Sequence, residues 1–220
     1  MMRPASWLAA LALSAVAASG AAGQSAGGAH HGHDHAPLQA AGPVPPVTAE
    51  DRVLGDPDAA VTVIEYASFT CGHCAAWHEQ VWPAFRTRFI DTGQVRFIHR
   101  DLPTAPHELS RQAAVIARCA APDRFYPAVD ALMSGQQAAR QTGDVPGWLV
   151  SGAVAGGLTP DRLETCMNDE ALAARIEAGV QGAVAAGVEG TPTFFVNGEP
   201  VEGDLDSLEA AIAPLIAQDG

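Results

Sequence analysis

The chain has 220 residues, of which 48% are apolar and 17% are charged. This is enough chain for one or two compact domains, and the composition excludes a disordered protein. Acidic residues outnumber basic ones by 25 to 12, which gives a formal net charge of −13, and every basic residue is an arginine. The lack of lysine excludes Schiff-base and P-loop lysine chemistry. The acidic balance argues against nucleic acid as a partner, because phosphate backbones are bound by Lys and Arg clusters.

Residues 1–23 predict a secretory signal peptide. Arg3 supplies a positive charge, an apolar run follows from Trp7 to Ala18, and small residues continue to Gly23. A charged start, a short apolar stretch and a small-residue exit are typical of a cleaved export signal. The run is too short to span a bilayer. We therefore expect an exported chain that is not membrane-embedded and that resides in a bacterial periplasm.

Residues 24–50 are polar, small and proline-rich, and such a segment cannot bury enough apolar surface to fold by itself. We expect a flexible leader here. It contains four closely spaced histidines: His30, His31, His33 and His35. They form either a solvated low-complexity tract or a weak site for Cu or Zn, because nothing in their spacing imposes a coordination geometry.

Residues 51–104 predict the first half of a mixed α/β domain. Val61–Tyr66 is rich in β-branched residues and predicts a buried strand. Helical periodicity follows over 75–89, with a kink expected at Pro83, and Val95–His99 predicts a second strand. A strand, a helix and a strand in this order form a βαβ unit whose strands lie parallel.

Residues 105–187 predict an inserted all-helical domain, because apolar residues recur there at helical spacings. Its helices are expected at 106–120, 122–133, around 148–154, at 160–167 and at 169–186. Residues 188–220 return to the mixed pattern. Thr193–Val196 and a second short strand flank Asn197-Gly198, which is a strong hairpin signal, and a final helix follows. The chain is therefore predicted to be one α/β domain interrupted by a helical one.

Cys71-Gly72-His73-Cys74 is the sharpest chemical feature of the sequence. The spacing lets both sulfurs approach to disulfide distance across one helical turn, and Cys71 falls at a predicted helix N-terminus. Unpaired N–H groups there stabilise a thiolate and lower a cysteine pKa from about 8.5 into a range of about 3.5 to 7.5. His73 adds a positive charge or a hydrogen bond, and Cys74 is expected to be the less exposed, resolving thiol.

Half of a zinc site and a plain structural disulfide are the alternatives for this cysteine pair. Structural zinc takes four ligands, commonly two such pairs, and the other cysteines of the chain stand alone. We therefore predict a redox-active disulfide between Cys71 and Cys74 and no metal at this site.

Two further elements belong to the predicted site. Glu65 precedes Cys71 on the adjacent strand, where it either relays a proton to and from Cys74 or forms a local salt bridge. The bond between Thr191 and Pro192 lies in a tight turn, where an X–Pro bond can be cis. We expect structural roles for His99 at the end of the second strand and for Trp77, Trp82 and Trp148, which fill the core or line the domain seam. His78 is either a surface histidine, which we favour, or a neighbour of the redox pair.

These residues resemble the DsbA family of thiol–disulfide oxidoreductases. The similarity rests on the run from Glu65 to Cys74 and on the run from Gly190 to Phe194, and it covers roughly 51–218. It implies a thioredoxin-like fold with an all-helical insertion. It further implies the nucleophile, the resolving cysteine, a buried acid and a cis-proline loop that binds substrate backbone; these are Cys71, Cys74, Glu65 and Thr191-Pro192.

The resemblance implies an exported enzyme, without cofactor, that introduces disulfide bonds into reduced secreted clients. A quinone-linked membrane partner of the DsbB kind would then reoxidise it. The best-studied family members have proline at the position of Gly72, and CGHC is the pattern of protein disulfide isomerase. An isomerase or reductase of the same fold is thus one alternative. A Cu- or Zn-binding module that uses the histidine-rich leader is another.

Cys119 and Cys166 lie in separate predicted helices of the insertion. They are either buried free thiols or the two halves of a structural disulfide. The even cysteine count and an oxidising compartment favour the disulfide, and some DsbA relatives carry a comparable bridge.

Overall fold

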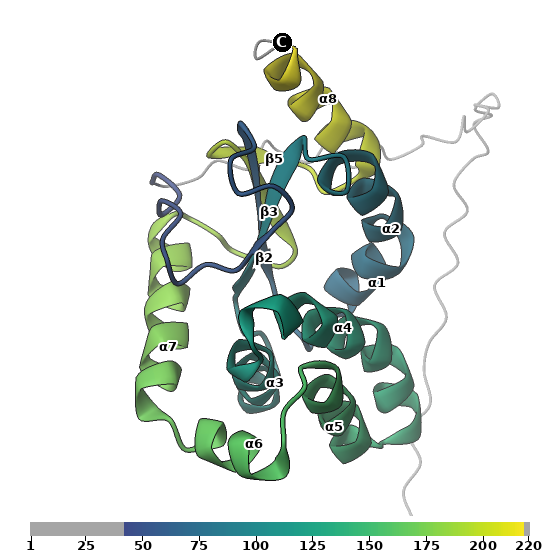
Figure 1. Ribbon diagram of the computed structural model, residues 1–220, viewed down its shortest axis with the longest axis vertical. Helices are drawn as coiled ribbons and strands as arrows, with labels where there is room; N and C mark the ends of the chain where they lie inside the picture. Colours follow the sequence, from purple (N-terminus) through teal and green to yellow (C-terminus); the bar gives the residue numbers. More distant parts are fainter. Residues whose placement is uncertain (1–41, 218–220) are drawn as a thin grey trace, which may run out of the picture. The chain divides into compact units, whose positions relative to one another are not determined.

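The computed structural model describes residues 42–217 of the chain (Figure 1). The predicted signal peptide and the histidines of the leader lie outside these residues. No helix within the described range is both long enough and apolar enough to cross a membrane.

A five-stranded sheet lies at the centre of the fold, with strand order β1-β3-β2-β4-β5. β2 and β3 are parallel, and the other neighbouring strands are antiparallel. The predicted βαβ unit is therefore confirmed. The strands are β1 Val53–Leu54, β2 Val61–Ala67, β3 Val95–Asp101, β4 Thr193–Val196 and β5 Glu199–Val201.

The helix after β2 is interrupted, as its proline predicts. α1 spans Gly72–Gln80, α2 spans Trp82–Phe85, and a π-helical turn continues through Arg86–Ile90. Pro83 lies at the start of α2, where its missing N–H costs nothing because the first turn of a helix leaves such groups unpaired. Trp77 and other aromatic residues of these helices pack on Phe97 of β3.

The segment between β3 and β4 is helical, as predicted. It contains α3 His107–Cys119, a 3₁₀ turn at Pro122–Arg124, α4 Phe125–Thr142, α5 Val145–Ala155, α6 Pro160–Met167 and α7 Glu170–Ala185. α4 continues past the predicted end at Met133, because its later turns still face the protein through buried Gln136 and Ala139. Gly143 ends the helix with φ 76°, a left-handed conformation that favours glycine.

A disulfide joins Cys119 at the end of α3 to Cys166 in α6, with a Cα–Cα distance of 6.1 Å. This confirms the predicted pairing. In the chain-entropy model, a bridge across a loop of this length contributes about 4 kcal/mol to the stability of the folded state.

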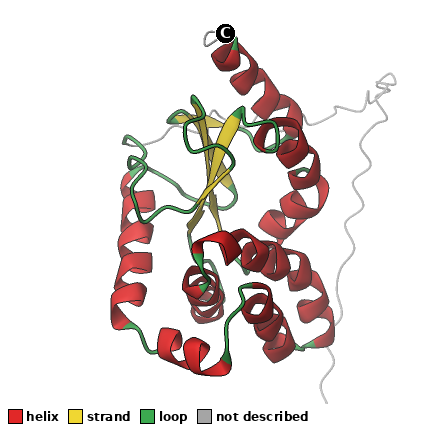
Figure 2. Cartoon of the chain, viewed as in Figure 1, coloured by secondary structure: helices red, strands yellow, loops and turns green. Residues whose placement is uncertain are grey.

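Helices cover both faces of the sheet (Figure 2). The larger core packs α1, α2, α3, α4 and the C-terminal helix α8, Leu205–Ile216, against one face. The smaller core packs α7 against the other face, together with Val44 and Val47. Residues 42–50, which the sequence places in the leader, thus include apolar side chains that contact the folded part.

The hairpin between β4 and β5 has the predicted turn. Asn197 and Gly198 both have positive φ, 48° and 93°, as a two-residue type I′ turn requires. The hairpin brings the residues that precede β4 to the end of β2. The candidate site lies where these two segments meet.

Candidate active site

Two free thiols lie where β2 gives way to α1. Cys71 is the N-cap of α1 with extended backbone angles, and it is partly exposed. Cys74 lies one turn further on, with 0% of its surface exposed. The helix has no acidic residue in its first turn, so its N-terminal N–H groups face Cys71 without a competing carboxylate. One thiol is thus open to a substrate and the other is enclosed.

The surroundings of Cys71 favour its thiolate. A hydrogen bond from the Cys74 thiol is the largest influence, and Thr191 and the backbone N–H groups of His73 and Cys74 act in the same direction. Together they outweigh burial and lower the pKa of Cys71 to about 5. The side chain of His73 is exposed. A thiolate at neutral pH is both a better nucleophile and a better leaving group than a thiol.

The surroundings of Cys74 act in the opposite direction. Burial raises the pKa of its thiol, and the hydrogen bond to Cys71 and the negative charge of Glu65 raise it further. Cys74 therefore holds its proton at neutral pH, and any reaction that uses its sulfur requires a group that accepts this proton.

We expect the thiolate absorbance of the reduced protein to titrate with a midpoint near pH 5, because the Cys71 pKa is lowered to about 5. Ultraviolet absorbance between pH 3 and 9 measures it. Cys71→Ser should abolish the transition and Cys74→Ser should move it to higher pH, because Cys74 supplies the largest stabilising contact. A midpoint above pH 8 in the unmodified protein would contradict the assignment.

The loop before β4 faces the thiols. The bond between Thr191 and Pro192 is cis, as the sequence suggests, and the Thr191 carbonyl lies 3.1 Å from the Cys71 sulfur. The Thr193 hydroxyl donates a hydrogen bond of 2.8 Å to the Gly190 carbonyl and closes the turn. This loop, distant in the sequence, is thus held beside the more exposed thiol.

Two residues that the sequence did not predict, Gln136 and Arg140, hold the backbone of residues 69–71, the thiol loop. The Gln136 amide, buried on α4, donates to the carbonyls of Phe69 at 2.6 Å and Cys71 at 3.1 Å. Arg140, one turn along α4, donates to the Thr70 carbonyl. The sequence signal for them is weak, since polar residues four apart on a helix usually mark a solvated face.

Glu65 lies at the centre of a buried cluster. Its side chain is fully enclosed, and Oε2 lies 3.3 Å from Nδ1 of His99 and 3.5 Å from Nε2 of His78. Burial raises the pKa of Glu65, but the charges and hydrogen bonds of the two histidines outweigh burial and lower it to about 2. For His99, burial lowers the pKa, and the contacts with Asp101 and Glu65 outweigh it and raise it to about 9.

The prediction that His78 is a surface residue is wrong. It is 8% exposed, because the face of α1 that carries it, one turn beyond Cys74, lies against the sheet. The salt-bridge alternative for Glu65 is present in the structure, with histidines as partners. The relay role of Glu65 stays a prediction. Trp77, Trp82 and Trp148 are buried, as predicted.

Within the described residues, Glu65, His78 and His99 are also a group whose potential ligand atoms all lie within 4.8 Å of one another. A hydrogen bond between Glu65 and His99 and a contact of 3.5 Å between Glu65 and His78 account for this proximity. We therefore interpret the cluster as ion pairs. The second cysteine pair is bonded to itself, so the zinc alternative for Cys71 and Cys74 lacks a second pair of thiols.

The profile of the family described as Thioredoxin matches residues 47–213, and the chain belongs to this family. A putative protein-disulfide oxidoreductase of Rickettsia bellii is 29% identical over 175 residues, which cover 78% of this chain and 67% of that protein. A Na⁺/H⁺ antiporter, NhaA 3 of Salinispora tropica, is 36% identical over 79% of this chain but only 26% of the antiporter. The crystal structure of Wolbachia pipientis α-DsbA1 superimposes with a TM-score of 0.67 at 25% identity, covering 78% of this chain and 94% of that one.

Fold, site and relatives together define the class: a thiol–disulfide oxidoreductase with a thioredoxin fold and a DsbA-like helical insertion. The predicted fold class and the resemblance to DsbA proteins are confirmed. The chain spans 60% to 67% of the length of the first Rickettsia relatives that it matches. The direction of the reaction, the clients and the partners of this chain are therefore matters for proposal.

Proposed function

We propose that this protein oxidises reduced, exported client proteins by donating the Cys71–Cys74 disulfide. The observation that supports this direction is the contrast between the two thiols. The surroundings of Cys71 stabilise its thiolate, which is present only in the reduced protein and in the leaving group. Stabilising the reduced state makes the disulfide a stronger oxidant.

The reaction balances as two exchanges. A client thiolate attacks the Cys71 sulfur, a client–Cys71 disulfide forms, and the bond to Cys74 breaks with the electron pair on the Cys74 sulfur, which takes up a proton. A second client thiolate then attacks the client sulfur of this mixed disulfide and releases Cys71 as a thiolate. The client loses two electrons and two thiol protons, and the protein gains the two electrons.

We assign the remaining predicted residues roles within this scheme. Glu65, whose charge acts on Cys74, exchanges the proton of the resolving thiol. Thr191 and Pro192 bind the client backbone beside the Cys71 sulfur, since their loop lies at the partly exposed thiol. The exposed His73, between the two cysteines, contributes positive charge or a hydrogen bond beside an approaching client thiolate.

Export and reoxidation are parts of the same proposal. A signal peptide over 1–23 would deliver the chain to the periplasm, where reduced secreted proteins are its substrates. A quinone-linked membrane partner of the DsbB kind would return the two electrons to the respiratory chain.

The domain boundaries proposed are a leader to residue 50, the two thioredoxin-like parts 51–104 and 188–220, and the helical insertion 105–187. Metal capture by the histidine-rich leader remains an alternative.

The redox equilibrium of the purified mature protein with glutathione tests the direction. We expect a reduction potential between about −120 and −180 mV, the range of DsbA and protein disulfide isomerase. Acid quenching, thiol alkylation and mass spectrometry measure the ratio of reduced to oxidised protein. A value near −270 mV, that of thioredoxin, would make the protein a reductant and contradict the proposal.

A further inference from the structure

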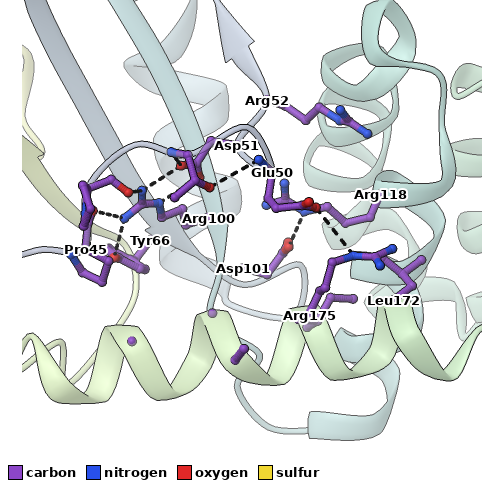
Figure 3. Close-up of a pocket in the computed structure, with 16 residues that line it drawn as sticks. Pro45, Glu50, Asp51, Arg52, Tyr66, Arg100, Asp101, Arg118, Leu172 and Arg175 are labelled. Atoms are coloured by element: carbon purple, nitrogen blue, oxygen red, sulfur yellow. Dashed lines mark hydrogen bonds and ion pairs between the residues drawn. The ribbon is translucent and has the colours of Figure 1, made fainter.

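A pocket of about 380 Å³ lies on the α7 side of the sheet, between β3, α7 and the segment 45–52 (Figure 3). Four of the twelve arginines of the chain line it: Arg52, Arg100, Arg118 and Arg175. Asp101, the last residue of β3, also lines it. The scheme proposed above gives this pocket no role.

Asp101 connects the pocket to the protein interior. Its Oδ2 accepts a hydrogen bond of 2.7 Å from Nε of Arg118 (Figure 3). Its Oδ1 makes no hydrogen bond and lies 3.5 Å from Nε2 of His99, which also lacks a hydrogen-bond partner. One carboxylate thus faces a pocket arginine with one oxygen and a buried imidazole with the other.

The sheet register explains why these groups line up. In the parallel pair β2–β3, Glu65 lies opposite His99. His99 and Asp101 are two residues apart on one strand and share a face of the sheet. The imidazole therefore bridges two carboxylates, with Nδ1 at 3.3 Å from Glu65 and Nε2 at 3.5 Å from Asp101.

We propose that Asp101, acting through His99 and Glu65, is the point at which the proton exchanged by Cys74 passes between the protein interior and the water of the pocket. The inference rests on the proposed function, since it supplies the proton route which that reaction needs. An imidazole suits the central position because it accepts a proton at one ring nitrogen and releases one from the other.

Several elements of the fold contribute the charged and polar groups that surround Glu65, His99 and Asp101. His78 and Cys74 face Glu65 from α1, and Arg118 faces Asp101 from α3. From α4, the Tyr126 hydroxyl accepts a hydrogen bond from the backbone N–H of His99. Because its pKa is raised to about 9, His99 is an imidazolium at neutral pH, so it releases the Nε2 proton toward Asp101 before Nδ1 takes one from Glu65.

A second route leads from Glu65 through His78 to Asp130, which is the more exposed aspartate. Both contacts of this second route are longer than their counterparts. Glu65 lies 3.5 Å from His78 but 3.3 Å from His99, with which it forms a hydrogen bond. His78 lies 3.9 Å from Asp130, whereas His99 lies 3.5 Å from Asp101. Distance therefore favours the route through Asp101.

The closing of a glutathione mixed disulfide isolates the proton transfer. Oxidised glutathione reacts with the Cys71 thiolate and releases one glutathione thiolate. Cys74 then gives up its proton, and its thiolate attacks the Cys71 sulfur and expels the second glutathione as a thiolate, which is protonated by water. Acid quenching and mass spectrometry follow the mixed disulfide through this unimolecular step.

We expect Asp101→Asn to slow closure about tenfold, less than the loss of a direct acid–base catalyst, because Glu65 remains in place. The rate of the first step, at Cys71, should not change. Proton transfer should become rate-limiting in this variant, so that its closing rate in D₂O falls more than that of the parent and its pH profile changes shape. A purely structural role would alter neither the isotope effect nor the profile.

Asp51→Asn is the matched control, because Asp51 lines the same pocket and pairs with a partly buried arginine, Arg100, but touches neither Glu65 nor His99. It should close at the parent rate. Unchanged closure in Asp101→Asn, or slow closure in Asp130→Asn alone, would overturn the inference while leaving the proposed function intact. Failure of the parent to react with oxidised glutathione would instead contradict the proposed function.

Discussion

Cys74→Ser is expected to leave the protein joined to its clients as stable mixed disulfides, and Cys71→Ser is expected to reduce disulfide exchange to the uncatalysed rate. Cys71 is the partly exposed thiol with a pKa lowered to about 5, so we expect it to form the bond to the client. Cys74 is fully buried, and in the proposed reaction its sulfur closes the disulfide by attacking Cys71. Without it, the mixed disulfide has no internal route to resolution.

Non-reducing gels and mass spectrometry of a periplasmic extract check the first expectation, and oxidation of a reduced model protein checks the second. The double variant with serine at Cys119 and Cys166 is the control, since these residues are bonded to each other in a different part of the fold. The folded double variant should exchange disulfides at the parent rate. Adducts formed by Cys71→Ser, or their absence from Cys74→Ser, would reverse or remove the roles assigned to the two thiols.

Glu65→Gln is expected to slow closure of the mixed disulfide by about 10²-fold or more, because it removes the group that we propose exchanges the Cys74 proton. It should also destabilise the fold by about 3 kcal/mol, the lower end of the range for breaking a buried ion pair. The lower end applies because His99, whose pKa is raised in part by Glu65, can give up its proton when the carboxylate is gone. Stopped-flow kinetics and chemical unfolding measure the two effects separately.

The pH dependence of stability distinguishes this ion pair from a neutral contact. The pKa of His99 is raised from 6.5 to about 9 by the fold, so its stabilising contribution is complete below pH 6.5 and disappears as the pH rises through 9. The pKa of Glu65 is lowered to about 2, so its contribution is complete above about pH 4.5 and disappears as the pH falls through 2.

We therefore expect the free energy of unfolding of the oxidised parent, in which the disulfide-bonded Cys71 and Cys74 do not titrate, to decline between pH 6.5 and 9, and this decline to be smaller in Glu65→Gln. A replacement on the surface, such as Glu202→Gln at an exposed position, is the control and should follow the parent. If the free energy of unfolding depends on pH in the same way in the parent and in Glu65→Gln, the ion pair between Glu65 and His99 does not contribute to stability.

Local sequence determined the parts of this protein that depend on neighbouring residues. The β-branched run of β2, the helical periodicity around Pro83 and the Asn197-Gly198 turn each specify their own backbone conformation. The cysteine spacing places one thiol at a helix N-terminus and the other one turn along, which is enough to predict that the first thiol is the more exposed one. These features were sufficient to predict the fold class and the central thiols.

The tertiary structure alone decided what surrounds the thiols. His78 faces the interior because α1 packs that face on the sheet, and Glu65 meets His99 because β2 and β3 pair in one particular register. Gln136 and Arg140 reach the thiol loop from a helix more than sixty residues away in the sequence. Such contacts depend on how the elements pack against each other, and no periodicity within one element encodes the side chain that another presents to it. The thiol pair was therefore predictable from the sequence, whereas the histidine partners of Glu65 and the contact between His99 and Asp101 were not.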